Sequence, residues 1–338
     1  MTRHLEILTA HPGLTIQDLG RPGLLAKGVS RGGAVDATAL AEGGALLGQP
    51  VDWAIEMAGA GGRFRLSGGG GTVALTGAPM RAEIDGRSVA WAASHALPGG
   101  AVLSIGPALA GAYGYLTLDA PLRTPPILGA RSAHLAAGIG APLASGDALP
   151  LGPASGASPG LTFRNLDDRF SGGLLRLLPH AQSHLFSDET LARFTSEIFQ
   201  RDPRASRRGF RLVPPGEGYG TTDGLSIPSD AITPGDVQVA GDGTPMILLA
   251  ECQTTGGYPR IGTVISADLP RAAQAAPGAE LSFRFVTLDE ALSARAAHRA
   301  HLADLPRRIA PLLRDPSEMA DLLSYRLIDG VTVGDDLA

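Results

Sequence analysis

The sequence predicts a mainly β protein with a few helices, organised in about two domains. The chain has 338 residues, and a domain takes roughly 150 residues. Its 46 glycines and 26 prolines interrupt the sequence often enough to favour many short strands joined by turns over long helices. Hydrophobic residues make up 44% of the chain but aromatic residues only 5%, so aliphatic side chains must fill the cores.

Composition also excludes several classes of protein. A net charge of -5 argues against a nucleic-acid-binding protein, which would carry a basic surplus on one face. The single cysteine, Cys252, excludes a disulfide framework and any cysteine-based zinc or iron–sulfur site. The chain has no run of about eighteen apolar residues, so we expect no transmembrane helix. Its first residues lack the apolar segment of a secretory signal.

The first half of the chain reads as a series of strands with one helix. Short alternating or apolar runs predict strands at 5–10, 14–19, 53–58, 63–66, 72–76, 81–84, 87–91, 101–105 and 113–118. Asp85-Gly86 predicts a type I′ hairpin, because both central residues of that turn need positive φ. A helix is expected over 36–47, where the apolar spacing ends at Gly48; a loop is the alternative.

Turn-forming residues fill 152–160 and predict a linker. We therefore expect a first domain over 1–152, a linker over 153–160, a second domain over 161–287 and a helical tail over 288–338. In the second domain, strands are expected at 173–178, 210–213, 237–239, 246–252 and 281–286, with helices at 188–199 and 268–275.

The tail begins with a capping box, Thr287 to Glu290, which predicts a helix reaching about residue 305. Apolar residues at helical spacing follow from Ile309 to Leu323. Such a tail packs on the body of the protein, packs on a partner or forms an exposed helix.

Three familiar motifs fail on chemical grounds. Residues 156–160 match the G-x-S-x-G nucleophile elbow, but Pro159 has no N–H for an oxyanion. The glycine run at 69–71 precedes a predicted strand, whereas a dinucleotide fingerprint must open a helix. The histidine pairs 180/184 and 298/301 lack the H-E-x-x-H frame, which favours surface or capping roles and predicts no metal site.

Two segments carry more polar groups than a surface loop needs. The first, over 15–36, places two arginines, two aspartates, a glutamine and a serine among glycines, where an arginine can bind a carboxylate or carbonyl. A structural role is the alternative, with Asp18 pairing with Arg21 or Arg31. The second, over 248–260, runs from a buried strand into Gln253, two threonines and two glycines, which suits an amide or urea-like ligand.

A tight bulge capped by threonine hydroxyls is the alternative for the second segment, and Cys252 is expected to be a core residue. We expect both segments to line one pocket between the two domains.

These segments resemble the biotin-dependent carboxyltransferase family, which includes the carboxyltransferase region of urea carboxylase, allophanate hydrolase subunit 2 and the KipA-like C subunit of 5-oxoprolinase. The Gln-Thr-Thr-Gly-Gly-Tyr-Pro run at 253–259 carries most of the likeness. Leu-Gly-Ala-Arg-Ser at 128–132 and Gly-Asp-Val-Gln-Val at 235–239 add to it. The resemblance implies two cyclophilin-like β-barrel domains facing each other across a cleft, in a bacterial cytoplasmic protein.

The resemblance also implies a function. As the C subunit of an ATP-dependent 5-oxoprolinase, the chain would act with a KipI-like B subunit and an A subunit to convert 5-oxoproline, ATP and water to glutamate. No ATP-binding motif is found in this chain, so ATP is expected on a partner. The alternatives are a biotin-dependent carboxyltransferase acting on a urea or allophanate-type substrate, with biotin on another chain, and a non-catalytic KipA-like regulatory protein.

Site residues follow from the matching motifs. The residues expected to be catalytic are Arg31, Asp36, Glu251 and Gln253. The residues expected to bind substrate are Gln17, Asp18, Arg21, Ser30, Arg131, Thr254, Thr255, Gly256, Gly257 and Tyr258. No metal ligand is expected among them.

The chain also departs from the family's motifs. Pro79 and Ser206 stand where the motifs have aspartate, Arg208 replaces methionine, and Glu251 replaces aspartate. Asp-Ala-Pro-Leu at 119–122 replaces Ala-Gly-Gly-Ile. If the lost acids serve catalysis, the chain is a divergent relative with another substrate or an inactive binding subunit.

Overall fold

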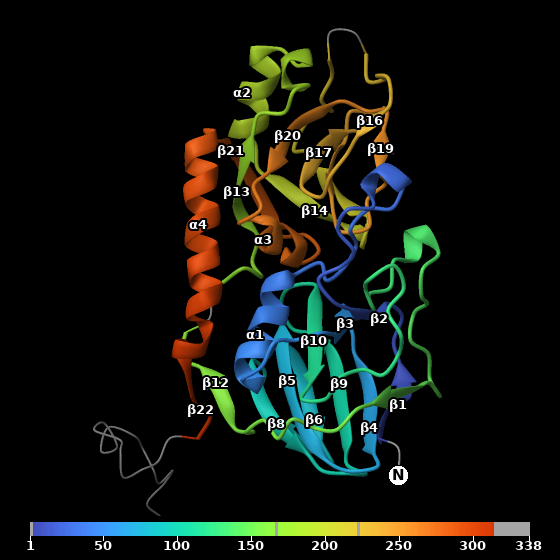
Figure 1. The fold of residues 1–338 in the computed structure, drawn as a ribbon. Coiled ribbons are helices and arrows are strands. Elements are labelled where there is room, and N and C mark those ends of the chain that lie inside the picture. The colour runs from blue at the N-terminus through green and yellow to red at the C-terminus, as the bar shows by residue number, and fades with distance from the viewer. Residues whose placement is uncertain (1–2, 166–167, 222–223, 314–338) are drawn as a thin grey trace, which may run out of the picture.

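The computed structural model describes residues 3–165, 168–221 and 224–313. Two β-rich domains are stacked end to end, and the long helix α4 (Leu288–Asp304) runs alongside both of them (Figure 1). The prediction of a mainly β chain with a few helices is confirmed. No helix in these three ranges is both long and apolar enough to cross a membrane.

One layer of the N-terminal domain is a six-stranded antiparallel sheet in the order β11-β1-β4-β9-β6-β7. Its strands are β1 (Arg3–Ala10), β4 (Gly62–Ser67), β6 (Met80–Ile84), β7 (Arg87–Val89), β9 (Val102–Ala108) and β11 (Ala148–Leu151). Asp85 and Gly86 both have positive φ in the tight β6–β7 turn, which confirms the predicted hairpin.

The second layer is a seven-stranded sheet in the order β2-β3-β10-β5-β8-β12-β22. Its strands are β2 (Leu14–Gln17), β3 (Ala54–Ala58), β5 (Gly71–Gly77), β8 (Ala93–Leu97), β10 (Tyr113–Leu118), β12 (Leu161–Phe163) and β22 (Ile309–Pro311). Aliphatic side chains from both sheets form the core between them. Every residue of β10 is buried, because α1 (Ala37–Leu47) covers the outer face of this sheet.

The C-terminal domain is a closed barrel of seven strands in the order β13-β20-β17-β18-β15-β14-β21. These are β13 (Gly173–Leu178), β14 (Phe199–Ser206), β15 (Gly209–Val213), β17 (Asp236–Val239), β18 (Pro245–Leu248), β20 (Arg260–Val264) and β21 (Glu280–Phe285). The parallel pair β13 and β21 closes the barrel. Helix α2 (Asp188–Ser196) supplies Phe194, whose ring lies 4.8 Å from that of Phe283 in the barrel core.

Short elements complete the structure. They are η1 (Leu25–Lys27), η2 (Leu135–Ala137), η3 (Ser183–Leu185), α3 (Leu269–Gln274), η4 (Leu305–Arg308) and the two-stranded ribbon of β16 (Asp230–Ala231) with β19 (Thr255–Gly256). Asp36, which was predicted to be catalytic, caps α1 by accepting hydrogen bonds from the N–H groups of Thr38 and Ala39. The predicted capping box of α4, formed by Thr287 and Glu290, is confirmed.

The chain leaves the first domain later than predicted. Strand β12 pairs with β8, so residues 161–163 belong to the N-terminal sheet and not to the second domain. The predicted linker lies against the first domain, because Thr72 Oγ1 donates a hydrogen bond to the carbonyl of Ala157 and the N–H of Gly160 donates to the carbonyl of Ser94.

The tail returns to the first domain instead of continuing as a helix. Residues 309–311 form β22, which pairs with β12 at the edge of the N-terminal sheet, so the helical expectation is wrong there. The rest of that apolar pattern, from residue 314 on, lies outside the described residues. Before this return, Leu305 packs against Leu46 and Leu47 of α1, while Ala291 packs beside Val286 of the second domain. The tail helix therefore joins both domains.

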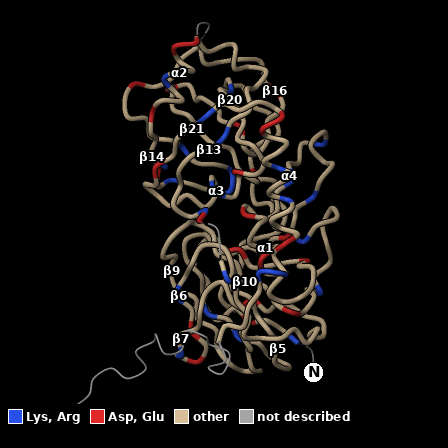
Figure 2. Tube along the Cα trace, turned by 90° about the vertical axis from the view of Figure 1, so that its left-hand side faces the viewer, with Lys and Arg blue, Asp and Glu red and all other residues tan. Residues whose placement is uncertain are grey.

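Charge is distributed evenly over the side of the molecule on which α4 lies. Basic and acidic residues are interspersed there, and neither sign forms an extended stripe (Figure 2). This interspersed pattern agrees with the small net charge of the chain.

Candidate functional site

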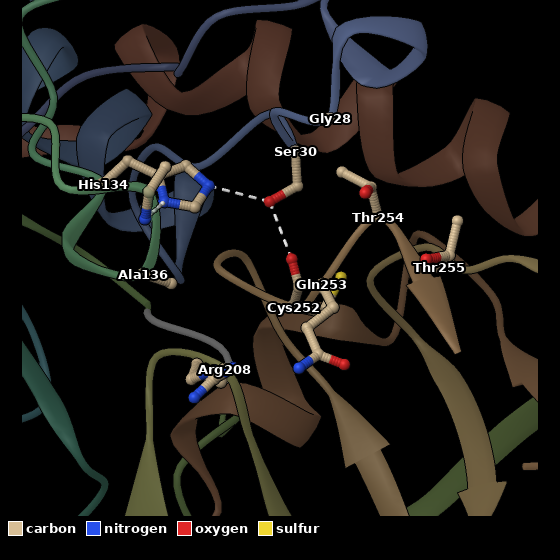
Figure 3. Close-up of a pocket in the computed structure, with 10 residues that line it drawn as sticks. Gly28, Ser30, His134, Ala136, Arg208, Cys252, Gln253, Thr254 and Thr255 are labelled. Carbon is tan, nitrogen blue, oxygen red and sulfur yellow. Dashed lines mark hydrogen bonds between the residues drawn. The ribbon is translucent and has the colours of Figure 1, made fainter. Parts of the chain in front are cut away.

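A cavity of about 390 Å³ lies where the two domains meet. We call it the interdomain cavity, and it is lined by Gly28, Ser30, His134, Ala136, Ala137, Arg208, Cys252, Gln253, Thr254 and Thr255 (Figure 3). The first five residues come from two loops of the N-terminal domain, and the others come from the β14–β15 turn and the segment after β18. The segments around Ser30 and Gln253 therefore share one pocket, although more than two hundred residues separate them.

A chain of hydrogen bonds crosses the domain boundary at one wall of the interdomain cavity. Ser30 Oγ lies 2.8 Å from Nε2 of His134 and donates to the carbonyl of Cys252 over 2.8 Å (Figure 3). Nδ1 of His134 accepts a hydrogen bond from the N–H of Ala137, so Nε2 carries the proton of the neutral ring and donates to Ser30. Burial lowers the pKa of His134, which favours this neutral form.

This arrangement orients Ser30 and does not activate it. The serine proton is committed to a main-chain carbonyl, and His134 acts on Ser30 as a donor and not as a base. One lone pair of Ser30 Oγ remains available to accept a hydrogen bond from a ligand. Burial also raises the pKa of the neighbouring Cys252 thiol to about 12, so this group is protonated at neutral pH and is a poor nucleophile.

Behind the cavity, Arg207 joins buried carboxylates from both domains. It donates to Glu56 of β3, to Glu251 Oε1 over 2.6 Å and to the carbonyl of Gly33 over 2.6 Å. Glu251 also accepts the N–H of Ala136 over 3.0 Å. Burial alone would raise the pKa of Glu251, but the charge of Arg207 and these hydrogen bonds outweigh burial and hold that pKa below its usual value.

Of the four residues predicted to be catalytic, Gln253 lines the cavity and three do not. Arg31 is exposed, and its Nε donates to the carbonyl of Leu19 over 2.9 Å. Asp36 is fully buried, where it caps α1 and accepts hydrogen bonds from Arg169 and Gln274. Glu251 is directed onto Arg207. These partners hold the three side chains away from the cavity, and the spacing of the motifs indicates none of the partners.

The residues predicted to bind substrate divide into those that line the cavity and those that do not. Ser30, Thr254 and Thr255 line it. In the other group, Asp18 accepts the N–H groups of Gly20 and Arg131 and so braces the first loop through backbone groups, without the side-chain pairing to Arg21 or Arg31 that was the structural alternative. Arg21 is buried and donates to the carbonyl of Ser132, and it forms no ion pair with Asp18 in the described structure. Gln17 is also buried, and its side-chain amide donates to Thr15 and Ala133.

The remaining predicted binding residues lie beyond the cavity wall. Gly256 forms part of β19, where close approach favours glycine: a Cβ atom would lie 2.6 Å from Nε2 of Gln238. Gly257 contributes no lining atom, and its carbonyl accepts the N–H of Ile227. Tyr258 is 45% exposed outside the cavity, and Arg131 donates from Nε to the carbonyl of Thr124.

Sequence reasoning missed His134, the key role of Arg207 and the position of Arg208 on the cavity wall. His134 follows the recognised 128–132 segment by two residues, so extending that segment would have found it. Arg207 and Arg208 fall within a family motif, but the motif alone assigns neither of them a contact. Within the described ranges, no group of three or more histidine, cysteine or acidic residues is placed to hold a metal ion.

Comparison with known proteins places this geometry in a family. Residues 27–285 match the family model "Carboxyltransferase domain, subdomain A and B". The chain is 31% identical to the C subunit of the 5-oxoprolinase of Escherichia coli, over 90% of its own length and 98% of that protein. It is 32% identical to the C subunit of the 5-oxoprolinase of Haemophilus influenzae, with the same coverage.

A solved structure shares the fold at lower identity. The urea carboxylase of Kluyveromyces lactis superposes with a TM-score of 0.78 at 20% identity, over 93% of this chain and 31% of that one. The family match covers well over half of the chain, and two relatives above 30% identity are aligned over nearly their whole length. The chain therefore belongs to the carboxyltransferase subdomain A and B family.

Proposed function

We propose that this chain is the C subunit of an ATP-dependent 5-oxoprolinase and that its interdomain cavity binds the lactam ring of 5-oxoproline. The two relatives that carry this name align with 90% of the chain over 98% of their own length. The observation that carries the proposal is the cavity itself, because both domains build it and its wall is mostly polar.

The wall offers the hydrogen-bonding groups that a lactam requires. A lactam presents one N–H donor beside one carbonyl acceptor. The free lone pair of Ser30 Oγ can accept the N–H, since its other interactions are with His134 and Cys252. The amide of Gln253 and the hydroxyl of Thr254 can donate to the carbonyl from the other domain. Closure of the two domains on one ring would thus fix its orientation.

The proposed role of this chain is to bind and orient, with ATP held by a partner. The lining thiol and hydroxyl are not activated, as the pKa of Cys252 and the hydrogen bonds of Ser30 indicate. ATP would transfer its γ-phosphoryl group to the lactam oxygen, after which water adds to the carbon, the ring C–N bond breaks and phosphate leaves. Such activation removes the need for a nucleophile from this chain.

The proposal includes two partners, a KipI-like B subunit and an A subunit. Urea carboxylation with biotin on another chain remains the alternative from the same family, and a regulatory role without catalytic function is the second. These three functions differ in the substrates and cofactors that the assembled protein needs, so one reconstitution experiment separates them.

The test is to co-express the chain with the products of its neighbouring genes and to measure glutamate formed from 5-oxoproline. The proposal predicts glutamate release that requires both ATP and this chain. Matched reactions lacking this chain, lacking ATP, or containing urea, bicarbonate and a biotinylated carrier serve as controls. Glutamate release that persists without this chain would support a regulatory role, and urea-dependent carboxylation would support the alternative enzyme.

A further inference from the structure

Arg208 is the only residue with a full charge among the ten that line the interdomain cavity. We propose that Arg208 binds the carboxylate of the substrate, so that the cavity selects a lactam bearing a carboxylate over an uncharged lactam or urea. This inference rests on the proposed function and adds to it the residue that recognises the acidic group.

The backbone of Arg208 is fixed while its side chain is free. Arg208 lies in the turn between β14 and β15, where its N–H donates to Ser206 Oγ and its carbonyl accepts the N–H of Leu249. The residue is exposed, and among the described residues its guanidinium has neither an ion-pair partner nor a hydrogen-bond acceptor. A cation held at a cavity wall without a carboxylate of its own is suited to an anionic ligand.

The neighbouring residue in this turn, Arg207, has a different environment from Arg208. Arg207 is buried and committed to Glu56, Glu251 and Gly33, so it is unavailable to a ligand. By binding both carboxylates, Arg207 also keeps them off the cavity wall, and Arg208 therefore meets no competing acid there. The charge that a ligand encounters in this cavity is positive.

The geometry of the wall allows carboxylate and lactam to be bound together. Arg208 lies on the side of the cavity away from Thr254 and Thr255, with Ser30 and Gln253 between these groups (Figure 3). A guanidinium binds a carboxylate through two parallel N–H···O bonds, which an ammonium cannot match. Urea has no group for this contact, so Arg208 contributes to discrimination as well as to affinity.

The test compares two ligands that differ only in the carboxylate, using the co-expressed complex. We would measure KM and kcat for 5-oxoproline, and inhibition by 2-pyrrolidinone, which has the same ring without the acid. Arg208→Met puts back the methionine of the family motif, so it tests a contact that is particular to this chain. It should raise KM about tenfold to a hundredfold, as expected for the loss of a charge-assisted hydrogen-bonded pair. Inhibition by 2-pyrrolidinone should stay within about twofold, because the ring contacts remain.

Two further variants separate recognition from structural damage. Arg208→Lys keeps the charge but loses the paired geometry, so its KM should lie between those of the wild type and Arg208→Met. Arg204→Met is the matched control, since Arg204 lies in the same hairpin with a side chain 81% exposed and paired with Asp202, outside the cavity. It should leave KM unchanged.

The outcomes are distinguishable. An unchanged KM in Arg208→Met, with normal turnover by the wild type, would refute the role of Arg208 and leave the proposed function intact. An equal loss of 5-oxoproline and 2-pyrrolidinone binding would show that Arg208 acts on the fold and not on the carboxylate. Absence of any 5-oxoproline turnover by the wild-type complex would overturn the proposed function and this inference with it.

Discussion

Replacing Arg207 with methionine should destabilise the chain strongly, because it leaves two buried carboxylates without their shared cation. Glu56 and Glu251 are 0% and 2% exposed, and the contact between Arg207 and Glu56 joins the two domains. Removing one partner of a buried ion pair costs about 3–5 kcal/mol, since the remaining charge has lost its compensation.

The remaining hydrogen bonds set where in that range the loss should fall. Glu56 would still accept the hydroxyl of Tyr115 and the N–H of Val35, and Glu251 would still accept the N–H of Ala136. These donors stabilise the charges in part, so we expect a loss near the lower limit, about 3 kcal/mol. The free energy of unfolding would be measured by urea denaturation, followed by far-ultraviolet circular dichroism for both domains.

Arg204→Met again provides the control, because the Arg204 side chain is 81% exposed and the backbone N–H at position 204 still donates to Asp202 after the change, so the loss should be about 1 kcal/mol or less. Arg207→Lys retains the charge but cannot reach three acceptors at once, so its stability should be intermediate. If Arg207→Met lowered the free energy of unfolding by no more than the Arg204 control, the assignment of Arg207 as the buried link between the domains would be refuted.

Three further predictions concern the cavity wall and Gly32, which packs against the His134 ring of that wall. Ser30→Ala should lower kcat/KM about tenfold while leaving measurable turnover, because Ser30 accepts a hydrogen bond and is not a nucleophile; a loss of several thousandfold in the same assay would contradict this. His134 is neutral in the folded protein because burial lowers its pKa, so it stabilises the fold above about pH 6.5 and this contribution is lost as the pH falls. His134→Gln should therefore flatten the fall in unfolding free energy between about pH 7 and pH 5, and an unchanged slope would argue against it. Gly32→Ala should lower the thermal stability more than Gly129→Ala does. Both glycines have positive φ, but only at Gly32 would a Cβ lie 2.9 Å from the His134 ring. Equal shifts in melting temperature would show that the His134 ring moves away from the new Cβ at no cost.

Local sequence signals predicted the elements well where one residue determines a backbone conformation. Gly48 identified the end of α1, Asp85 and Gly86 identified a hairpin, and Thr287 with Glu290 identified the start of α4. In each case the side chain or φ angle acts within three or four residues, so the chain around it contains the needed information.

Elements that depend on distant pairing were not predictable in the same way. Strand β22 exists because β12 offers an open edge about 150 residues earlier, and helical apolar spacing could not reveal that partner. The first domain boundary was misplaced for the same reason, since β12 is recognised only through its pairing with β8. Strand pairing across long sequence separations is a tertiary property, which local propensity does not encode.

The position of the interdomain cavity was predicted in outline, because two segments that line it are glycine-rich and unusual in composition; that this cavity is the functional site stays a prediction. Some side chains predicted for the site are held outside the cavity lining by buried partners, as Asp36 is by Arg169 and Glu251 is by Arg207. His134 was missed because its partner Ser30 lies more than one hundred residues earlier in the chain, and the carbonyl of Cys252 to which Ser30 donates lies more than one hundred residues later. Contacts that form only in the folded chain therefore decide which polar residues line the cavity and which are bound elsewhere.

The most direct test of the proposed site is a crystal structure of the chain, assembled with its partners, in complex with 5-oxoproline. The account predicts the ring in the interdomain cavity, with its N–H within about 3 Å of Ser30 Oγ and its carbonyl facing Gln253 or Thr254. An ordered ligand elsewhere, such as the apolar groove where Leu302 and Pro306 face α1, with only water between Ser30 and Gln253, would contradict it.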